Sequence, residues 1–159
     1  MIDRQTFERL LPLAYEWASA QEQFVLAHGV PLTSRQFEDA RRAGVQDCSG
    51  VRVLVVDRIP LPEIPELAEA ARRTGIITED SLCVGFGHAL IIQANHWANR
   101  ELIAHNLVHI AQCERSGGLK PWIHKYLSNR TTCPDFTVGE LEDEARNLAR
   151  EICARDSGR

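Results

Sequence analysis

The segment at residues 100–112 constrains the fold of this chain more than any other. It contains neither glycine nor proline, and apolar side chains lie almost all round it, so a helix buried in the core is predicted. This helix carries His105 and His109, four residues apart. Side chains at that spacing share one helix face, with Cβ atoms roughly 6 Å apart, so both imidazoles can reach one ion at about 2.0–2.1 Å. Imidazoles on a core helix need polar partners, and a metal ion satisfies both at once. The segment therefore predicts a metal site.

The bulk composition is that of an ordinary globular domain. The chain has 159 residues, of which 44% are hydrophobic and 25% charged, so a single domain over residues 1–159 with its own core is expected. The net charge of −4 and the pI near 5.9 predict neither a nucleic-acid nor a membrane surface. A short basic stretch at residues 120–130 is interrupted by aromatic and aliphatic residues, and we interpret it as the solvated side of an amphipathic helix.

The cysteines and the N-terminal residues indicate a reducing compartment. Five cysteines, an odd number, are widely spread and form no CxxC pair, so neither a disulfide framework nor a cysteine zinc site is expected. The first residues lack the apolar core of a signal peptide, and no apolar run approaches the roughly 20 residues that a membrane span needs. A cytoplasmic protein is expected, and the sequence gives no sign of its oligomeric state.

Residues 1–45 are predicted to be a helical scaffold. Apolar residues recur at helical spacing from residue 3 to residue 28, and Pro12 is expected to kink this helix or divide it in two. A second helix begins at a Thr33–Gln36 capping box and ends at Gly44.

Residues 51–93 are predicted to form a sheet. Its strands are expected at 51–57, 82–86 and 88–93, with a short helix at 65–73. Only Gly87 separates the last two strands, so they form either a tight hairpin or one bulged strand.

Residues 98–154 are predicted to hold the metal-binding helices. Two helices, at 121–127 and 138–154, follow the histidine helix, with a loop at 131–134 between them. The fold class is therefore α+β: a small, mostly antiparallel sheet of about three strands, with the histidine helix packed on it and flanking helices around it.

Three segments resemble small bacterial zincin metallopeptidase domains of the gluzincin type. They are GFGHALII at 85–92, RELIAHNLVHIAQCER at 100–115 and EDEA at 142–145. In that family a strand precedes an R-x-L-x-A-H-E-L-x-H-x-x-Q helix, and a later helix brings a glutamate followed by alanine. The similarity covers roughly residues 82–150, and the order of its parts is specific. It implies a zincin-like minimal metallopeptidase domain, with Zn²⁺ as cofactor and a peptide or small molecule as substrate.

The resemblance also implies a third metal ligand from the last helix. The matching residue is Glu144, with Glu142 as the alternative. From the residues alone, both carboxylates flank the apolar stripe of that helix at similar angles, and either could turn inward. Two histidines and one glutamate leave a fourth position open, as in catalytic zinc sites.

Asn106 departs from the family pattern. In the family this position holds the glutamate that takes the proton from the zinc-bound water. A carboxamide has no basic site at neutral pH, and loss of a general base costs about 10²–10⁴ in rate. As a peptidase the chain is therefore expected to be impaired or inactive, whereas metal binding does not depend on this residue.

Three interpretations of Asn106 follow. The domain is a natural pseudo-peptidase that binds a peptide or partner along an edge strand, formed by Gly87, His88, Ala89 and Leu90. Alternatively, the metal serves a non-proteolytic reaction, which needs another acid or base, and the candidates are Glu101, His88, Tyr126, His124 and Gln112. The third interpretation is an engineered inactivation of a peptidase.

Overall fold

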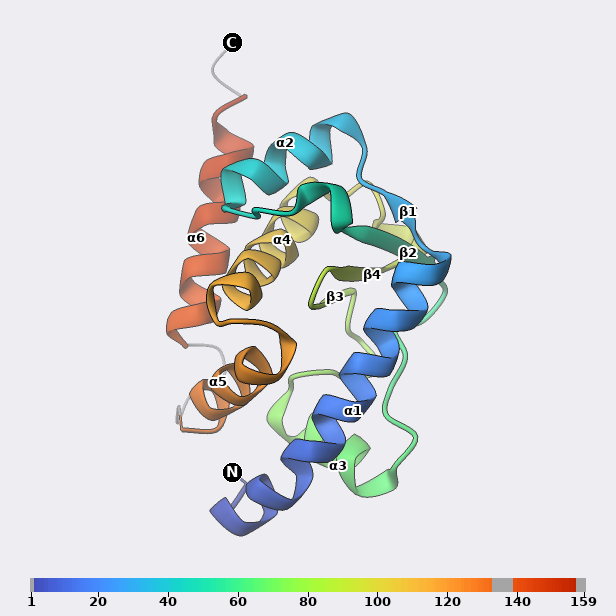
Figure 1. Ribbon diagram of the computed structural model, residues 1–159, viewed down its shortest axis with the longest axis vertical. Helices are drawn as coiled ribbons and strands as arrows, with labels where there is room; N and C mark the ends of the chain where they lie inside the picture. The colour runs from blue at the N-terminus through green and yellow to red at the C-terminus, as the bar shows by residue number, and fades with distance from the viewer. Residues whose placement is uncertain (1, 133–138, 157–159) are drawn as a thin grey trace.

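The computed structural model describes residues 2–132 and 139–156 (Figure 1). Within these ranges six α-helices surround a four-stranded mixed sheet, so the predicted α+β class is confirmed. The helices are α1 (Arg4–His28), α2 (Ser34–Ala43), α3 (Pro65–Thr74), α4 (Arg100–Arg115), α5 (Leu119–Thr132) and α6 (Glu140–Ala154). The strands are β1 (Val30–Pro31), β2 (Arg52–Val56), β3 (Cys83–Phe86) and β4 (Ala89–Gln93). Two short 3-10 helices, η1 (Cys48–Gly50) and η2 (Ala94–His96), precede β2 and α4.

The sheet has the strand order β1-β2-β4-β3. Its two outer pairs, β1 with β2 and β3 with β4, are antiparallel. The sequence did not predict the short strand β1, whereas the β3–β4 pair is the predicted hairpin. The central pair is parallel, with Val53 of β2 opposite Leu90 of β4. The expectation of a mostly antiparallel sheet is therefore wrong for the pair at its centre, and β4 lies in the interior of the sheet.

The turn between β3 and β4 consists of Gly87 and His88, so this segment is a tight hairpin. Gly87 has a φ of 61°, in the left-handed region that favours glycine. The carboxylate of Glu22 accepts a hydrogen bond from the His88 backbone N–H at 2.9 Å. It lies so close to Gly87 that a Cβ atom at this position would overlap it. The left-handed backbone thus favours glycine at this turn, and a larger residue would also displace the Glu22 carboxylate.

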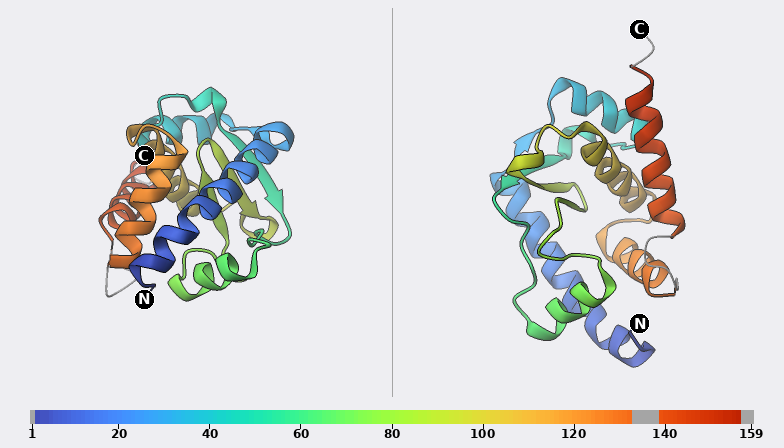
Figure 2. Two further views of the ribbon diagram at one scale, coloured as in Figure 1. Left: turned by 60° about the horizontal axis from the view of Figure 1, so that its bottom comes forward. Right: turned by 180° about the vertical axis from the view of Figure 1, so that it is seen from behind.

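Alternating side chains of β4 contribute to the core on both faces of the sheet. Leu90 and Ile92 pack in a cluster with α2, α4 and α6. Ala89 and Ile91 pack in a second cluster with α1, α3 and α5. The result is a helix–sheet–helix arrangement, seen from three sides in Figures 1 and 2. Because both faces of β4 are covered, its sequence is a continuous apolar run.

Helix α4 is the core helix that the sequence predicts. Ten of its 16 residues are buried, and it packs against α6, α2 and β3. None of the helices in the described ranges combines the length and apolarity needed to cross a membrane.

The predicted helix ends differ from the observed ends mainly around α5. Helix α1 continues through Pro12, and its packing against α3, α5 and the sheet supports both sides of that residue. Helix α2 has the predicted capping box and ends at Gly44. Helix α5 extends to Thr132, so the predicted loop does not begin at Thr131. The remaining residues of that loop, and Val138 at the predicted start of the last helix, lie outside the described residues.

An ion-pair network ties α4 to its two neighbouring helices. Arg100, at the start of α4, donates to both carboxylate oxygens of Asp39 on α2, at 2.9 and 2.8 Å. It also donates to Asp156, just beyond α6, at 2.7 Å. Asp39 is only 3% exposed, so its carboxylate depends on Arg100 for compensation.

Replacing Asp39 with alanine is expected to destabilise the fold by about 3 kcal/mol, because Arg100 then loses its buried partner. The matched control is Asp156→Ala, which removes the more exposed partner and is expected to cost about 1 kcal/mol or less. Urea unfolding measures both changes as shifts in the midpoint. Equal effects of the two substitutions would contradict the role given to the Asp39 pair.

Candidate metal centre

Three side chains from α4 and α6 converge at one point. The Nε2 atoms of His105 and His109 lie 3.1 Å apart. The carboxylate of Glu142 lies 3.1 Å from His105 Nε2 and 3.2 Å from His109 Nε2. One ligand atom from each residue lies within 4.8 Å of the other two. The structure thus brings together the predicted histidine pair and a glutamate that could hold a metal ion with them.

Glu142, not Glu144, is the glutamate at this point. Glu144 instead accepts hydrogen bonds from Arg115 at 2.9 Å and from Gln112 at 2.8 Å. Its placement as the third member of the group is therefore corrected in favour of the alternative residue. The physical reason is the direction of the buried stripe of α6. Ala145, Ala149 and Ile152 are fully buried, and Glu142 lies in line with them at helical spacing, whereas Leu148 is only partly buried.

Gln112 fixes the orientation of His109. The Gln112 amide nitrogen donates to the Leu141 carbonyl at 2.9 Å and to Glu144 at 2.8 Å. Its oxygen therefore faces His109 Nδ1, at 2.8 Å, and must accept a hydrogen bond from the Nδ1–H group. A neutral His109 then has its lone pair on Nε2, the atom that points at His105 and Glu142. Arg115, Glu144 and Gln112 thus form a chain of contacts that selects the metal-binding tautomer.

The donor atoms fit a cation. Three groups face one another here: His105 Nε2, His109 Nε2 and the Glu142 carboxylate. If both rings are neutral, these groups share at most one proton, and it lies on His105 Nε2. The lone pair of His109 Nε2 would then face a carboxylate oxygen at 3.2 Å with no hydrogen between them. A metal ion placed among the three groups satisfies all of them at once, which is the usual solution for converging buried ligands.

Glu142 is held in its charged form. Burial by itself would raise the pKa of this carboxyl, but the adjacent His105 and His109 imidazoles outweigh burial and hold the pKa well below its usual range. The Tyr126 hydroxyl adds to this effect, because it donates to Glu142 Oε1 at 2.6 Å. The ring of Tyr126 stacks on Trp122, with centroids 4.9 Å apart, and meets His109 edge-on. Aromatic rings of α5 thus cover one side of the centre.

Asn106 lies beside the centre and has no basic group to offer. It is 5% exposed, and its Nδ2 donates to the Leu102 carbonyl one turn earlier, at 2.9 Å. This bond orients the amide, because an oxygen in the same place would repel the carbonyl.

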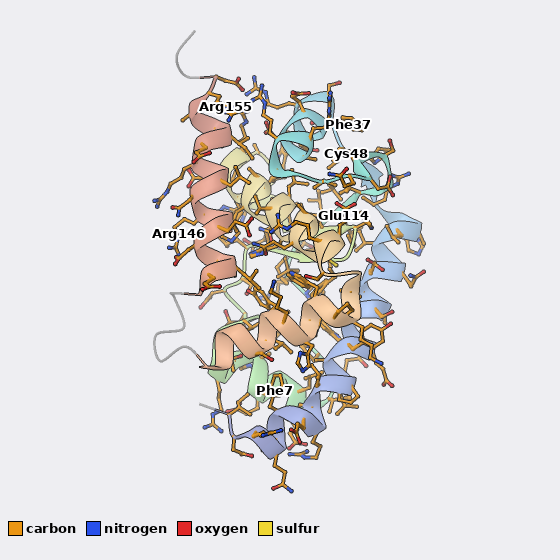
Figure 3. All side chains as sticks on the ribbon, turned by 60° about the vertical axis from the view of Figure 1, so that its left-hand side comes forward. Phe7, Phe37, Cys48, Glu114, Arg146 and Arg155 are labelled. Carbon is orange, nitrogen blue, oxygen red and sulfur yellow. The ribbon has the colours of Figure 1, made fainter. Side chains whose placement is uncertain are left out.

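Of the other acid or base candidates, the structure brings only Tyr126 and Gln112 to the centre. His88 contacts Glu114 at 3.1 Å, near the C-terminal end of α4, where Figure 3 labels Glu114. Glu101 is exposed and lies 3.8 Å from Arg150. His124 packs edge-on against Phe7 of α1, which is labelled in Figure 3. None of these three candidates lines the cavity that is formed in part by His105, His109 and Glu142.

The predicted edge strand for substrate is not an edge. Ala89 and Leu90 belong to β4, which pairs with β2 on one side and β3 on the other, and both residues are fully buried. Gly87 and His88 form the turn that precedes β4. The strand at this edge of the sheet is β3, whose residues line the cavity. The sequence did not show this, because the parallel pairing of β2 with β4 involves segments more than thirty residues apart.

A cavity of about 340 Å³ opens beside the cluster of His105, His109 and Glu142, which we call the metal group. Its polar end consists of His105, Asn106, His109, Tyr126 and Glu142. Its other walls come from α1, α3, α5 and β3, which lie together in the left-hand view of Figure 2. No single segment of the sequence indicated this cavity, because helices distant along the chain enclose it.

No protein-family model, no curated protein and no solved structure matches this chain. The likeness to zincin metallopeptidases therefore rests on the motifs in the sequence alone.

Replacing Glu144 with alanine is expected to weaken Zn²⁺ binding about 10–100-fold, because Gln112 loses a contact that holds it against His109. Competition with a chromophoric chelator measures the change, and Glu140→Ala, at an exposed position of the same helix, is the control. An effect as large as that of Glu142→Ala would show Glu144 to be a ligand. An unchanged affinity would show that the contact chain does not act on His109.

Proposed function

We propose that this protein binds Zn²⁺ through His105, His109 and Glu142, in a metallopeptidase-like site that has lost its general base. The observation that carries the proposal is the convergence of these three groups beside a carboxamide. In this proposal Asn106 occupies the general-base position, so peptide hydrolysis is impaired. The site then serves to bind a ligand at the metal.

Two features favour zinc. Two imidazoles and one carboxylate form a ligand set that zinc uses in open sites with three protein ligands. His109 is also oriented through its second ring nitrogen by Gln112, the kind of outer contact that zinc-binding histidines make. Zinc, when bound, supplies a Lewis acid that polarises a ligand oxygen.

Neither Asn106 nor Tyr126 is suited to take a proton from a metal-bound water. Asn106 has no basic site, and its amide nitrogen is engaged with Leu102. The Tyr126 hydroxyl donates to Glu142 and so orients that carboxylate. It can hydrogen-bond a ligand, but a neutral phenol that donates its hydrogen bond to Glu142 is a poor base. Binding is therefore better supported than hydrolysis.

A non-proteolytic metal enzyme is the second candidate. Two histidines and one carboxylate also form the facial triad of non-haem iron(II) oxygenases. Metal analysis of the protein separates this candidate from the first, because it predicts iron where the first predicts zinc.

Protein purified without added metal is expected to carry Zn²⁺ at close to one equivalent per chain, as a site with three converging ligands retains its ion. Inductively coupled plasma mass spectrometry measures the content, with His105→Ala as the matched empty control. Less than about a tenth of an equivalent of any transition metal would contradict the proposal.

Asn106→Glu is expected to raise peptide cleavage by about 10²–10⁴, because it restores a proton acceptor beside the metal. Cleavage of a broad peptide panel measures this gain, with Asn106→Gln as the neutral control of similar size. A wild-type protein that cleaves as fast as Asn106→Glu would show that the missing carboxylate is not what limits hydrolysis.

A further inference from the structure

We infer that the cavity beside the metal group binds a single-chain aliphatic carboxylic acid, a fatty acid of medium length. Its carboxylate would lie at the metal end, and its hydrocarbon chain would lie between α1, α3 and α5. This inference rests on the proposed metal site and adds the class of ligand to it.

The walls of the cavity match a hydrocarbon chain. Every lining residue of α1 is apolar or aromatic, and Phe7, Leu10 and Leu11 are examples. The lining residues of α3 are aliphatic except for Thr74, whose hydroxyl already donates within its own helix. A volume of about 340 Å³ lies in the range of small-ligand sites. An extended apolar chain gains hydrophobic free energy in proportion to the apolar area that it buries here.

The polar end of the cavity matches a single negative charge. A divalent ion with Glu142 as its one carboxylate ligand has a net charge of about +1. A glutamate at position 106 would cancel that charge and remove its attraction for an anion. Asn106 is neutral, so the residue that disables hydrolysis also leaves the centre attractive to a carboxylate.

A buried donor lies near the same end. Trp122 lines the cavity, 6.0 Å from His109 between ring centroids. Its Nε1–H is buried and has no acceptor among the groups of the chain that the structure describes. Such a donor is costly to bury unpaired, and a carboxylate has a second oxygen that could accept from it.

A peptide fits these walls less well than a fatty acid does. Each peptide unit carries an N–H and a C=O group, and each costs free energy when it is buried without a partner. The walls on α1 and α3 offer apolar side chains and no free polar group to satisfy them. A fatty acid has its only polar group at one end, and the polar side chains of the cavity also gather at one end, apart from Thr74.

Titration calorimetry of zinc-loaded protein with decanoate tests the inference. Binding is expected to strengthen about fourfold per methylene along the series from butyrate to decanoate, until the cavity is full. Decanol, which has the same chain without the charge, is expected to bind at least tenfold more weakly than decanoate. Zinc content is measured in each sample, so loss of metal and loss of ligand binding are distinguished.

Three variants locate the ligand. Asn106→Asp introduces a negative charge with little change in size and is expected to weaken decanoate binding at least tenfold while zinc is retained. Trp122→Phe removes the indole donor and is expected to weaken it about tenfold. Ala14→Phe fills the cavity from α1 and is expected to abolish binding, whereas Ala20→Phe, at an exposed position of the same helix, leaves it unchanged.

The inference is overturned if zinc-loaded protein shows no decanoate binding, or if Ala14→Phe binds decanoate as the wild type does. It is also overturned if an acetylated, amidated apolar tetrapeptide binds and decanoate does not. If the protein holds no metal at all, the proposed function fails and this inference fails with it.

Discussion

The contact between Glu142 and the two histidines of α4 is the constraint on which the rest of the site depends. It places a charged carboxylate between two imidazoles in a largely buried position, and such a group is stable only with a cation or protons beside it. The close packing of α4 against α6 holds these groups in register. The ion pair of Arg100 with Asp156 joins the start of α4 to the C-terminal end of α6. The packing of α4 against α6 therefore holds the fold together at this point and also positions the three groups of the site.

Around this contact, each neighbouring side chain restricts what the centre can do. Gln112 fixes the proton of His109 on Nδ1, and the Tyr126 hydroxyl donates a hydrogen bond to Glu142. In the proposed function, Asn106 places a neutral amide where hydrolysis would need a base. The cavity then extends from this polar end into apolar walls. We interpret the whole as a site that retains the means of binding and lacks the means of moving a proton.

Local sequence patterns predicted much of this arrangement. The histidine helix, the capping box at Thr33 and the hairpin at Gly87 all depend on residues close together in the chain, and all are confirmed. The parallel pairing of β2 with β4 depends on distant segments, and the sequence placed β4 wrongly at an edge. The choice between Glu142 and Glu144 was decided by how α6 turns toward α4, which the apolar stripe alone did not resolve. The cavity was missed because three helices and a strand enclose it together.

The position of the metal is the most direct test of this account. A crystal of the zinc-loaded protein, measured at the zinc absorption edge, should show one strong anomalous peak. The account predicts this peak about 2.0–2.2 Å from Nε2 of His105, Nε2 of His109 and a carboxylate oxygen of Glu142. A peak bound by Glu144 in place of Glu142, or no peak near the two histidines, would contradict it.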